Sequence, residues 1–501
     1  MLPFQTLIAT SKESPLPIFR QITDRLVELV RAGMLKPGVF LPGTRQMGEL
    51  LLVNRKTVIK VYEELLAQNW LESEPRKGYR VTANLPETRP RSFQPGPSYF
   101  QKNYKYQQNV MPHLDGEQRL KFSDILIDDG YPDPRLSPYR EMNRVYSEQT
   151  TVTAQKQLLP YRPQGGLRTL KSAASELLND SRGLNISSDE IVITRGGQMP
   201  LYITASVLIK PGDKIAVAKI NDPMASQILE HAGGELIRIR HCEDGIDLDD
   251  LEKTLQIHRI TLLHIQPHNQ YPTGAVMSAE KRRKLLALIR TYNFWVIEED
   301  LGYDFDFESK PILPLASADH GGKLIYIGNF DRTISRSIKL GFLIACPEIL
   351  ARASYLQGLM DHHGEVEMET MLCKMIISGD FDRHLIKSKK LYNQRCNILC
   401  EQLMAKLGNV LSFSRPKAGL GLWLKFRENF PLDKFLKATS RQGLFWEYGH
   451  HVDNSLRFGF ASLSEKDIKR AVEIMHNCTL NLSESKICRH SDFPQIKAMT
   501  A

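Results

Sequence analysis

The stretch Tyr326-Ile327-Gly328-Asn329-Phe330-Asp331-Arg332-Thr333-Ile334-Ser335-Arg336-Ser337-Ile338-Lys339-Leu340-Gly341 determines how the rest of this chain is interpreted. It begins with the end of an apolar run, residues 324–327, that predicts a buried strand. Polar and basic residues follow the strand at once, and ligands of α/β sheets bind at the carboxyl ends of strands. Arg332 is a fixed cation there, because a guanidinium stays protonated at any cellular pH.

The same alternation extends on both sides of this stretch, from residue 122 to residue 480. Short apolar runs rich in β-branched residues alternate with helical patterns. This order predicts an α/β domain with a mixed, mostly parallel sheet. The strands are expected at residues 190–194, 214–218, 260–265, 294–298 and 324–327.

Candidate binding residues follow these expected strands. Gly196, Gly197 and Gln198 precede a helix expected to begin near Pro200, where backbone N–H groups can bind a phosphate. A carboxylate after a strand could hold a protonated ring nitrogen, and an arginine could bind a ligand carboxylate with two hydrogen bonds. The other candidates after these strands are Met224, Asn269, Glu299, Asp300, Tyr303, Arg332 and Lys339. Arg457 is a separate candidate, because it lies between apolar neighbours in an extended run, residues 456–460, near the C-terminus.

Residues 12–82 show a different pattern, in which three helices precede a pair of strands. The helices are expected at residues 17–32, 44–52 and 55–68, and Thr44 is a plausible cap of the second. Two extended runs, 70–73 and 79–82, flank a basic turn, so the order predicts a winged helix-turn-helix. The expected DNA contacts are Arg45, Asn54, Arg55, Lys56, Thr57, Lys77 and Gly78.

The remaining segments and the composition add boundaries. Residues 83–121 are rich in proline and predict an irregular linker, with a strand around Leu85 as the alternative; residues 481–501 predict a disordered tail. The net charge of +9 permits a nucleic-acid partner. The seven cysteines lack metal-ligand spacing, so no metal is expected. Without a membrane-spanning run or a signal pattern, a cytoplasmic location is expected.

Two known families resemble these two regions. Residues 12–82 resemble the GntR family, which has the Leu-Pro-x-x-Arg element ending at Arg45 and the Asn-Arg-x-Thr-Val element beginning at Asn54. From Tyr131-Pro132-Asp133-Pro134 to Phe460, the chain resembles class I aminotransferases, which are fold-type I pyridoxal-phosphate (PLP) enzymes. Joined in this order, the regions resemble MocR-type transcription regulators. The resemblance implies promoter DNA as a partner, PLP as a cofactor and a homodimer.

Several positions depart from the enzyme pattern. Arg332 stands where the enzymes have the lysine that forms a Schiff base with PLP, and arginine cannot form one. Asp331 replaces a serine, and Met224 replaces a ring-stacking tyrosine. Lys339 replaces the phosphate-binding arginine, which keeps the charge and loses the two-pronged geometry.

The carboxylate that would hold the pyridine nitrogen is either of two neighbours. Asp300 has the aminotransferase spacing to Tyr303, whereas alignment to the regulators favours Glu299. The overall prediction is a DNA-binding regulator whose aminotransferase-like domain dimerises and senses a small anionic or amino-acid-like effector, with the effector carboxylate at Arg457 and PLP bound at most non-covalently. The alternatives are a working PLP-dependent aminotransferase with an added DNA-binding domain, and a purely structural domain that never binds PLP.

Overall fold

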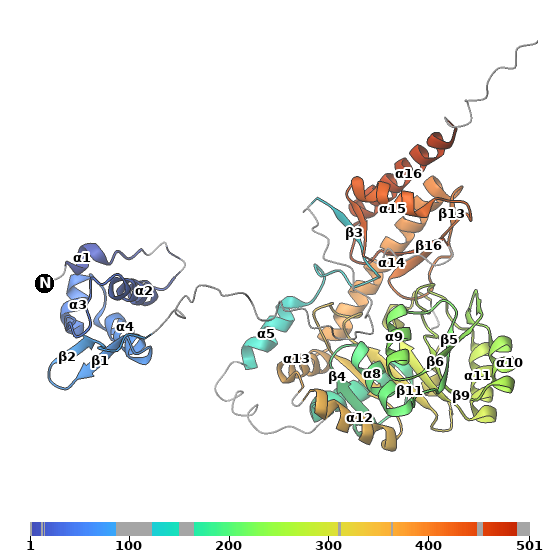
Figure 1. Cartoon of the computed structure of the whole chain (residues 1–501), viewed down its shortest axis with the longest axis horizontal. Helices are drawn as coiled ribbons and strands as arrows, with labels where there is room; N and C mark the ends of the chain where they lie inside the picture. Colours follow the sequence, from blue (N-terminus) through green and yellow to red (C-terminus); the bar gives the residue numbers. More distant parts are fainter. Residues whose placement is uncertain are drawn as a thin grey trace, which may run out of the picture. The chain divides into compact units, whose positions relative to one another are not determined.

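The computed structural model describes residues 3–11, 14, 16–86, 123–149, 165–308, 312–361, 364–447 and 454–487. The chain divides into two compact units, Met1–Glu117 and Gln118–Ala501 (Figure 1). Each unit has its own buried apolar core. Most of the predicted linker, and residues 488–501 of the predicted tail, lie outside the described residues.

The smaller unit is the predicted winged helix-turn-helix. Ile22 and Leu26 pack with Val58, Val61 and Leu65 in one core, which explains the helical spacing of these residues. The two strands pair in antiparallel fashion. The elements are α1 (Phe4–Leu7), α2 (Ile18–Arg31), α3 (Thr44–Leu50), α4 (Arg55–Ala67), β1 (Leu71–Glu74) and β2 (Gly78–Val81).

Three details of this unit differ from the sequence interpretation. Thr44 is the first residue of α3 rather than its cap: Gly43 precedes the helix, and no side chain caps it. The short helix α1 lies before the predicted start at residue 12, and Phe4 is buried in the same core. The described residues 83–86 contain no strand, so the alternative of a strand around Leu85 is not seen there.

The larger unit is built on a seven-stranded sheet with the order β4-β12-β11-β10-β9-β5-β6. Its strands are parallel except β12, which pairs in antiparallel fashion with both of its neighbours. The sheet is therefore mixed and mostly parallel, as predicted. The strands are β4 (Ile191–Thr194), β5 (Lys214–Ala218), β6 (Glu235–Ile239), β9 (Ile260–Ile265), β10 (Trp295–Asp300), β11 (Leu324–Asn329) and β12 (Gly341–Ile344).

Helices cover both faces of this sheet, which is why its strands are almost continuously apolar. Leu324 and Tyr326 of β11 belong to one core, and Ile325 and Ile327 belong to the core on the opposite face. The first face packs against α7 (Arg168–Arg182), α10 (Leu248–Ile257), α11 (Ala279–Tyr292) and α13 (Val366–Ile377). The second packs against α8 (Gln198–Leu208), α9 (Pro223–His231) and α12 (Pro347–Met360).

A further core lies beside a smaller three-stranded sheet. The long helix α14 contributes side chains to this core and to the first core of the large sheet (Figure 1). This part contains β13 (Leu411–Ser412), β14 (Gly421–Phe426), β16 (Ser455–Gly459), the parallel pair β3 (Ile125–Ile127) and β15 (Leu444–Trp446), α14 (Asp380–Leu407), α15 (Leu432–Arg441) and α16 (Glu465–Ile487). The other elements are α5 (Tyr139–Gln149), β7 (His241–Cys242), β8 (Gly245–Ile246), η2 (Ser188–Glu190), η3 (Tyr303–Phe305) and η4 (Leu315–Ser317).

Helix α16 corrects the predicted tail. It continues to Ile487, so residues 481–487 are helical rather than disordered, and Leu482 packs against the neighbouring core. Among the described residues, no helix is long and apolar enough to cross a membrane.

Candidate functional site

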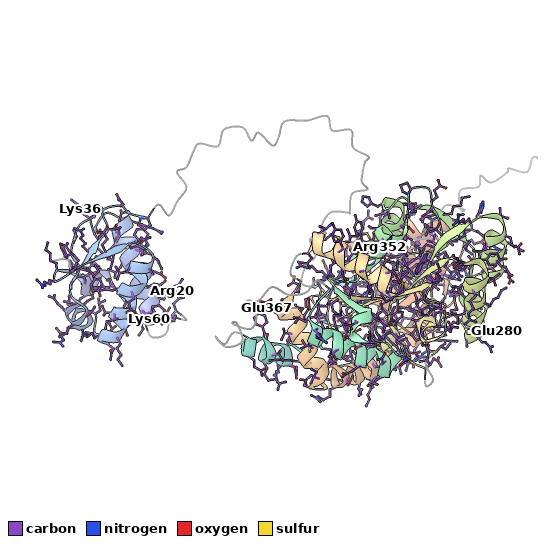
Figure 2. The ribbon with its side chains drawn as sticks, turned by 90° about the horizontal axis from the view of Figure 1, so that it is seen from below. Arg20, Lys36, Lys60, Glu280, Arg352 and Glu367 are labelled. Carbon is purple, nitrogen blue, oxygen red and sulfur yellow. The ribbon has the colours of Figure 1, made fainter. Side chains whose placement is uncertain are left out.

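The start of α4 forms the first candidate site, in the smaller unit. Arg55 and Lys56 are exposed there, and Arg45 is exposed at the start of α3. The starts of α3 and α4 are close to each other: Arg55 Nε donates a hydrogen bond of 3.4 Å to Thr44 Oγ1. Figure 2 shows further basic side chains of this unit, labelled Arg20, Lys36 and Lys60. Exposed cations at a helix N-terminus are suited to DNA phosphates and base edges.

Two predicted DNA-binding positions have structural roles as well. The Asn54 side chain caps α4 by accepting a hydrogen bond of 2.9 Å from the Lys56 backbone N–H. Gly78 has a φ of 108°, so the wing turn needs a residue that tolerates positive φ. Thr57 is half-buried, and Lys77 is exposed with its Nζ 2.6 Å from Glu74 Oε1.

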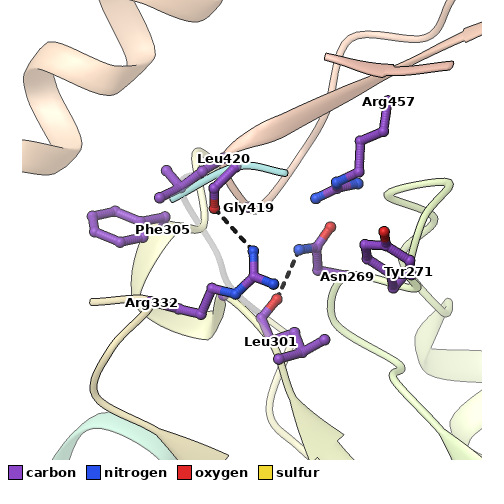
Figure 3. Close-up of a pocket in the computed structure, with 10 residues that line it drawn as sticks. Asn269, Tyr271, Leu301, Phe305, Arg332, Gly419, Leu420 and Arg457 are labelled. Atoms are coloured by element: carbon purple, nitrogen blue, oxygen red, sulfur yellow. Dashed lines mark hydrogen bonds between the residues drawn. The ribbon is translucent and has the colours of Figure 1, made fainter. Parts of the chain in front are cut away.

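The second candidate site is a small cavity at the carboxyl ends of β9, β10 and β11 (Figure 3). Its volume is about 20 Å³, which is space for one water molecule. Protein side chains therefore fill most of the region. The lining residues are Gly130, Asn269, Tyr271, Leu301, Gly302, Phe305, Arg332, Gly419, Leu420 and Arg457.

Arg332 is bound by the segment that follows β3. Its Nη2 donates to Asp129 Oδ2 at 3.1 Å, and its Nη1 donates to the carbonyls of Asp129 at 3.1 Å and Gly130 at 3.2 Å. The guanidinium also lies 4.0 Å from the centre of the Tyr131 ring. Burial disfavours the charged form, but Asp129 and the other nearby groups outweigh it, so the pKa of Arg332 is raised.

Arg457, in β16, enters the same cavity from the smaller sheet. Its side chain is 8% exposed, and its Nη1 donates to the Pro272 carbonyl at 2.6 Å. Gly421 makes room for it, because a Cβ there would lie 2.8 Å from Arg457 Cζ. Burial lowers the pKa of Arg457, and Asp129 offsets this effect only in part.

The two candidate carboxylates point to opposite faces of β10. Asp300 is held away from the cavity by Arg182 Nε at 2.9 Å and Tyr326 Oη at 2.6 Å. Glu299 lies on the other face and accepts hydrogen bonds from His264 at 3.1 Å and Gln266 at 2.6 Å. Burial raises the pKa of Glu299, but His264, Gln266 and Arg332 together lower it, so it stays ionised. The structure therefore places Glu299, and not Asp300, on the same side as Arg332.

The Gly196–Gln198 turn, which is expected to bind phosphate together with Lys339, contacts Lys339 through the backbone. The Gly196 N–H donates to the Lys339 carbonyl at 2.9 Å, so this donor is already used. Lys339 Nζ lies 3.7 Å from Asp331 Oδ2. Asp331 Oδ1 is buried and has no hydrogen-bond partner among the described residues. Burial raises the pKa of Asp331, which Arg332 and Lys339 only partly offset.

These contacts fit covalently bound PLP poorly. At residue 332, where the sequence resemblance predicts the Schiff-base position, the side chain is a guanidinium that Asp129 already binds and that cannot form an imine. A carboxylate, Asp331, lies 3.7 Å from the Nζ of Lys339, the cation expected to bind the phosphate, and would repel a phosphate there. No chemical step through PLP follows from this arrangement.

The remaining predicted residues are placed as follows. The Asn269 amide donates to the Leu301 carbonyl at 2.8 Å within the cavity wall. Met224 is the second residue of α9, which Asp222 caps, and burial raises the pKa of Asp222 to about 6. Tyr303 packs against His268 and Arg182, on the Asp300 side of the strand rather than in the cavity.

Sequence reasoning missed Asp129 and Tyr131, which hold Arg332. A signal was present, because Asp128 and Asp129 directly follow an apolar run, Ile125–Ile127, and precede a glycine. A carboxylate after a strand is a candidate ligand at this position for the same reason as it is after β10. Among the described residues, no cluster of His, Cys, Asp and Glu is arranged to hold a metal ion.

The sheet order and the family match define an aminotransferase-like domain of PLP fold-type I, in the same chain as a winged helix. Residues 137–475 match the family model of aminotransferase class I and II, so the chain belongs to this family, and residues 19–81 match the model of bacterial regulatory proteins of the gntR family.

Similar proteins include both regulators and enzymes. The probable rhizopine catabolism regulatory protein MocR of Rhizobium meliloti is 25% identical and covers 96% of this chain and 97% of its own length. The uncharacterized HTH-type transcriptional regulator YhdI of Bacillus subtilis is 24% identical and covers 92% of this chain and 96% of its own. An archaeal alanine:glyoxylate aminotransferase structure matches with a TM-score of 0.67 and 23% identity, over 72% of this chain and 91% of that one. The matches support a DNA-binding regulator with an aminotransferase-like domain.

Proposed function

We propose that this regulator binds promoter DNA through the start of α4 and that its larger unit senses a small anionic or amino-acid-like effector without covalent PLP chemistry. The contact of Arg332 with Asp129 carries the second half of the proposal, because the covalent anchor is replaced by an internal ion pair. The chain then acts in the cytoplasm as a pseudoenzyme and not as an aminotransferase.

Under this proposal, any PLP that binds the larger unit does so without a covalent bond. Glu299 would face the pyridine nitrogen, and Lys339 would lie near the phosphate. The effector carboxylate would bind Arg457. The larger unit would also form a homodimer, which would present two winged helices to paired half-sites.

The test is DNA binding at fixed salt to the promoter upstream of the protein's own gene. Arg55→Ala should weaken binding by about 1–3 kcal/mol if the guanidinium reads a base with two hydrogen bonds. Arg25→Ala is the matched control, because Arg25 is an exposed arginine of the same unit that pairs with Glu28 at 2.6 Å. Equal affinity of the Arg55 variant and the unmodified protein would remove Arg55 from the interface.

A further inference from the structure

One carboxylate, Asp129, is shared by two guanidiniums from distant parts of the larger unit. Arg332 follows β11, and Arg457 lies in β16. Asp129 Oδ2 accepts a hydrogen bond from Arg332 at 3.1 Å, and Asp129 Oδ1 lies 3.4 Å from Arg457 Nε. The Asp129 side chain is only 5% exposed. The cavity that the effector would enter is thus already crossed by an internal carboxylate.

The contact between Asp129 and Arg457 is incomplete. Asp129 Oδ1 is buried and has no hydrogen bond of regular geometry among the described residues, although Arg457 Nε lies 3.4 Å from it and the Tyr271 side chain also interacts with Asp129. Arg457 donates instead to neutral carbonyls, those of Pro272 at 2.6 Å and Asp129 at 3.3 Å. Two parallel N–H···O bonds are the strong arrangement between a guanidinium and a carboxylate, and Asp129 does not form it with Arg457. A carboxylate that is free to orient would bind Arg457 better.

The loop that carries Asp129 is a small unit of its own. Asp128 Oδ1 accepts the Gly130 N–H at 2.8 Å, which closes the turn around Asp129. Gly130 has a φ of 86°, and a Cβ there would lie 2.9 Å from the Leu420 carbonyl carbon. The loop backbone therefore packs closely on the segment before β14, while the Asp129 carboxylate is held by its contacts with Arg332 and Arg457.

We propose that Asp129 is a built-in competitor for the effector's carboxylate and that a dicarboxylate or amino-acid-like effector binds by taking Arg457 from it. Arg332 keeps Asp129 during the exchange, or pairs with a second anionic group of the effector. Because the cavity holds about 20 Å³, an effector needs a side chain to move before it can enter. The inference rests on the proposed effector site but not on DNA binding.

The test uses succinate as the probe, titrated calorimetrically into the full chain, with succinamide as the uncharged control. Asp129→Asn keeps the shape of the side chain and removes its charge, so succinate affinity should rise about tenfold, the effect of removing one close competing charge. Adding Arg457→Gln to this variant should abolish the gain. Asp133→Asn is the matched control, because Asp133 is a buried carboxylate paired with Arg395 at 2.8 Å outside the cavity.

Hydrogen exchange of the unmodified chain gives a second measurement that does not depend on a variant folding. Succinate should increase exchange in the peptide that covers residues 128–131, because Asp129 loses a partner, and Arg457→Gln should remove that response. Equal succinate affinity with aspartate or asparagine at 129, a gain that survives Arg457→Gln, or an unchanged exchange rate would each overturn the proposal. DNA affinity enters none of these results, so a failed promoter test leaves them interpretable.

Discussion

The candidate sites of the two units hold their arginines in opposite ways. In the smaller unit, Arg45 and Arg55 lie exposed at helix starts. In the larger unit, Arg182, Arg332 and Arg457 are each held against carboxylates of the same chain. An exposed cation is available to any polyanion that reaches it, whereas a buried, paired cation must first lose its internal partner. The difference predicts that DNA affinity falls steeply with salt concentration, and that an effector anion must compete with the internal carboxylates for the buried arginines.

The largest effect concerns the covalent chemistry of residue 332. A reducible adduct there would contradict the contrast between exposed arginines and buried, internally paired ones. After incubation with PLP and borohydride, the unmodified chain should carry no pyridoxyl group on the peptide that contains Arg332. Arg332→Lys introduces an amine and should yield that adduct, as measured by mass spectrometry. A trapped adduct on Lys339 of the unmodified chain would show that the site is covalent after all.

The next effect is the loss of a buried pair. Arg182 Nε lies 2.9 Å from Asp300 Oδ2 and its Nη2 lies 2.9 Å from Asp304 Oδ1, with only 6% of the side chain exposed. Arg182→Ala leaves two carboxylates without their cation and should destabilise the larger unit by about 3–5 kcal/mol. Scanning calorimetry of the full chain measures this as a lower transition temperature.

Arg144→Ala is the control for that experiment. The Arg144 side chain is 62% exposed, and its Nη2 lies 3.1 Å from Asp380 Oδ2. The Arg144 side chain lies at the surface, and Asp380 keeps Arg383 as a partner at 2.6 Å, so the substitution should cost about 0–1 kcal/mol and the transition should barely move. Equal effects of the two substitutions would mean that burial does not distinguish these ion pairs.

The sequence was sufficient for whatever depends on local pattern. The alternation of apolar runs predicted the strands around Leu324–Ile327 correctly, and the winged helix-turn-helix was confirmed. The fold-type I domain was also correct. These features depend on residues close in sequence, for which the spacing of apolar residues distinguishes helices from strands.

What the sequence could not supply is which distant side chains meet. Asp129 and Arg332 are far apart in the chain, and only the folded arrangement brings their atoms within 3.1 Å. The choice between Glu299 and Asp300 depended on which face of β10 each occupies, and spacing to Tyr303 could not decide it. The tail boundary at 480 failed because α16 continues through a polar stretch that shows little apolar periodicity.

A smaller effect extends the comparison from cations to carboxylates. Burial raises the pKa of Glu298 to about 7, even though Arg282 and the N–H groups of Leu315 and Ala316 lower it in part. Because the folded pKa is raised, the contribution of Glu298 to stability is fully present below its unfolded pKa of 4.5 and is lost as pH rises through about 7. The free energy of unfolding should thus decline between pH 5 and pH 8, by up to about 3 kcal/mol from this group.

Glu298→Gln should flatten this decline, since the amide does not titrate. Calorimetry of both proteins from pH 5 to pH 8 measures the difference, which isolates Glu298 from Asp222, whose pKa is also raised. An identical slope in the variant would show that Glu298 does not titrate in this range.

The smallest effect is expected at the wing, where a single exposed cation acts without burial. The Lys77 side chain is 66% exposed and pairs with Glu74 at 2.6 Å, so DNA must compete only with a solvated surface contact. If Lys77 binds a phosphate, Lys77→Ala should weaken promoter binding about equally for all sequences and reduce the slope of log affinity against log salt by about 1. Lys284→Ala, a lysine in the other unit whose side chain is 38% exposed and pairs with Asp249, is the control for net charge. An unchanged slope for the wing variant would mean that Lys77 does not reach the DNA. An equal loss of slope in both variants would mean that the salt dependence reports overall charge rather than a contact, and the contrast between exposed and buried cations would then lose its meaning for DNA binding.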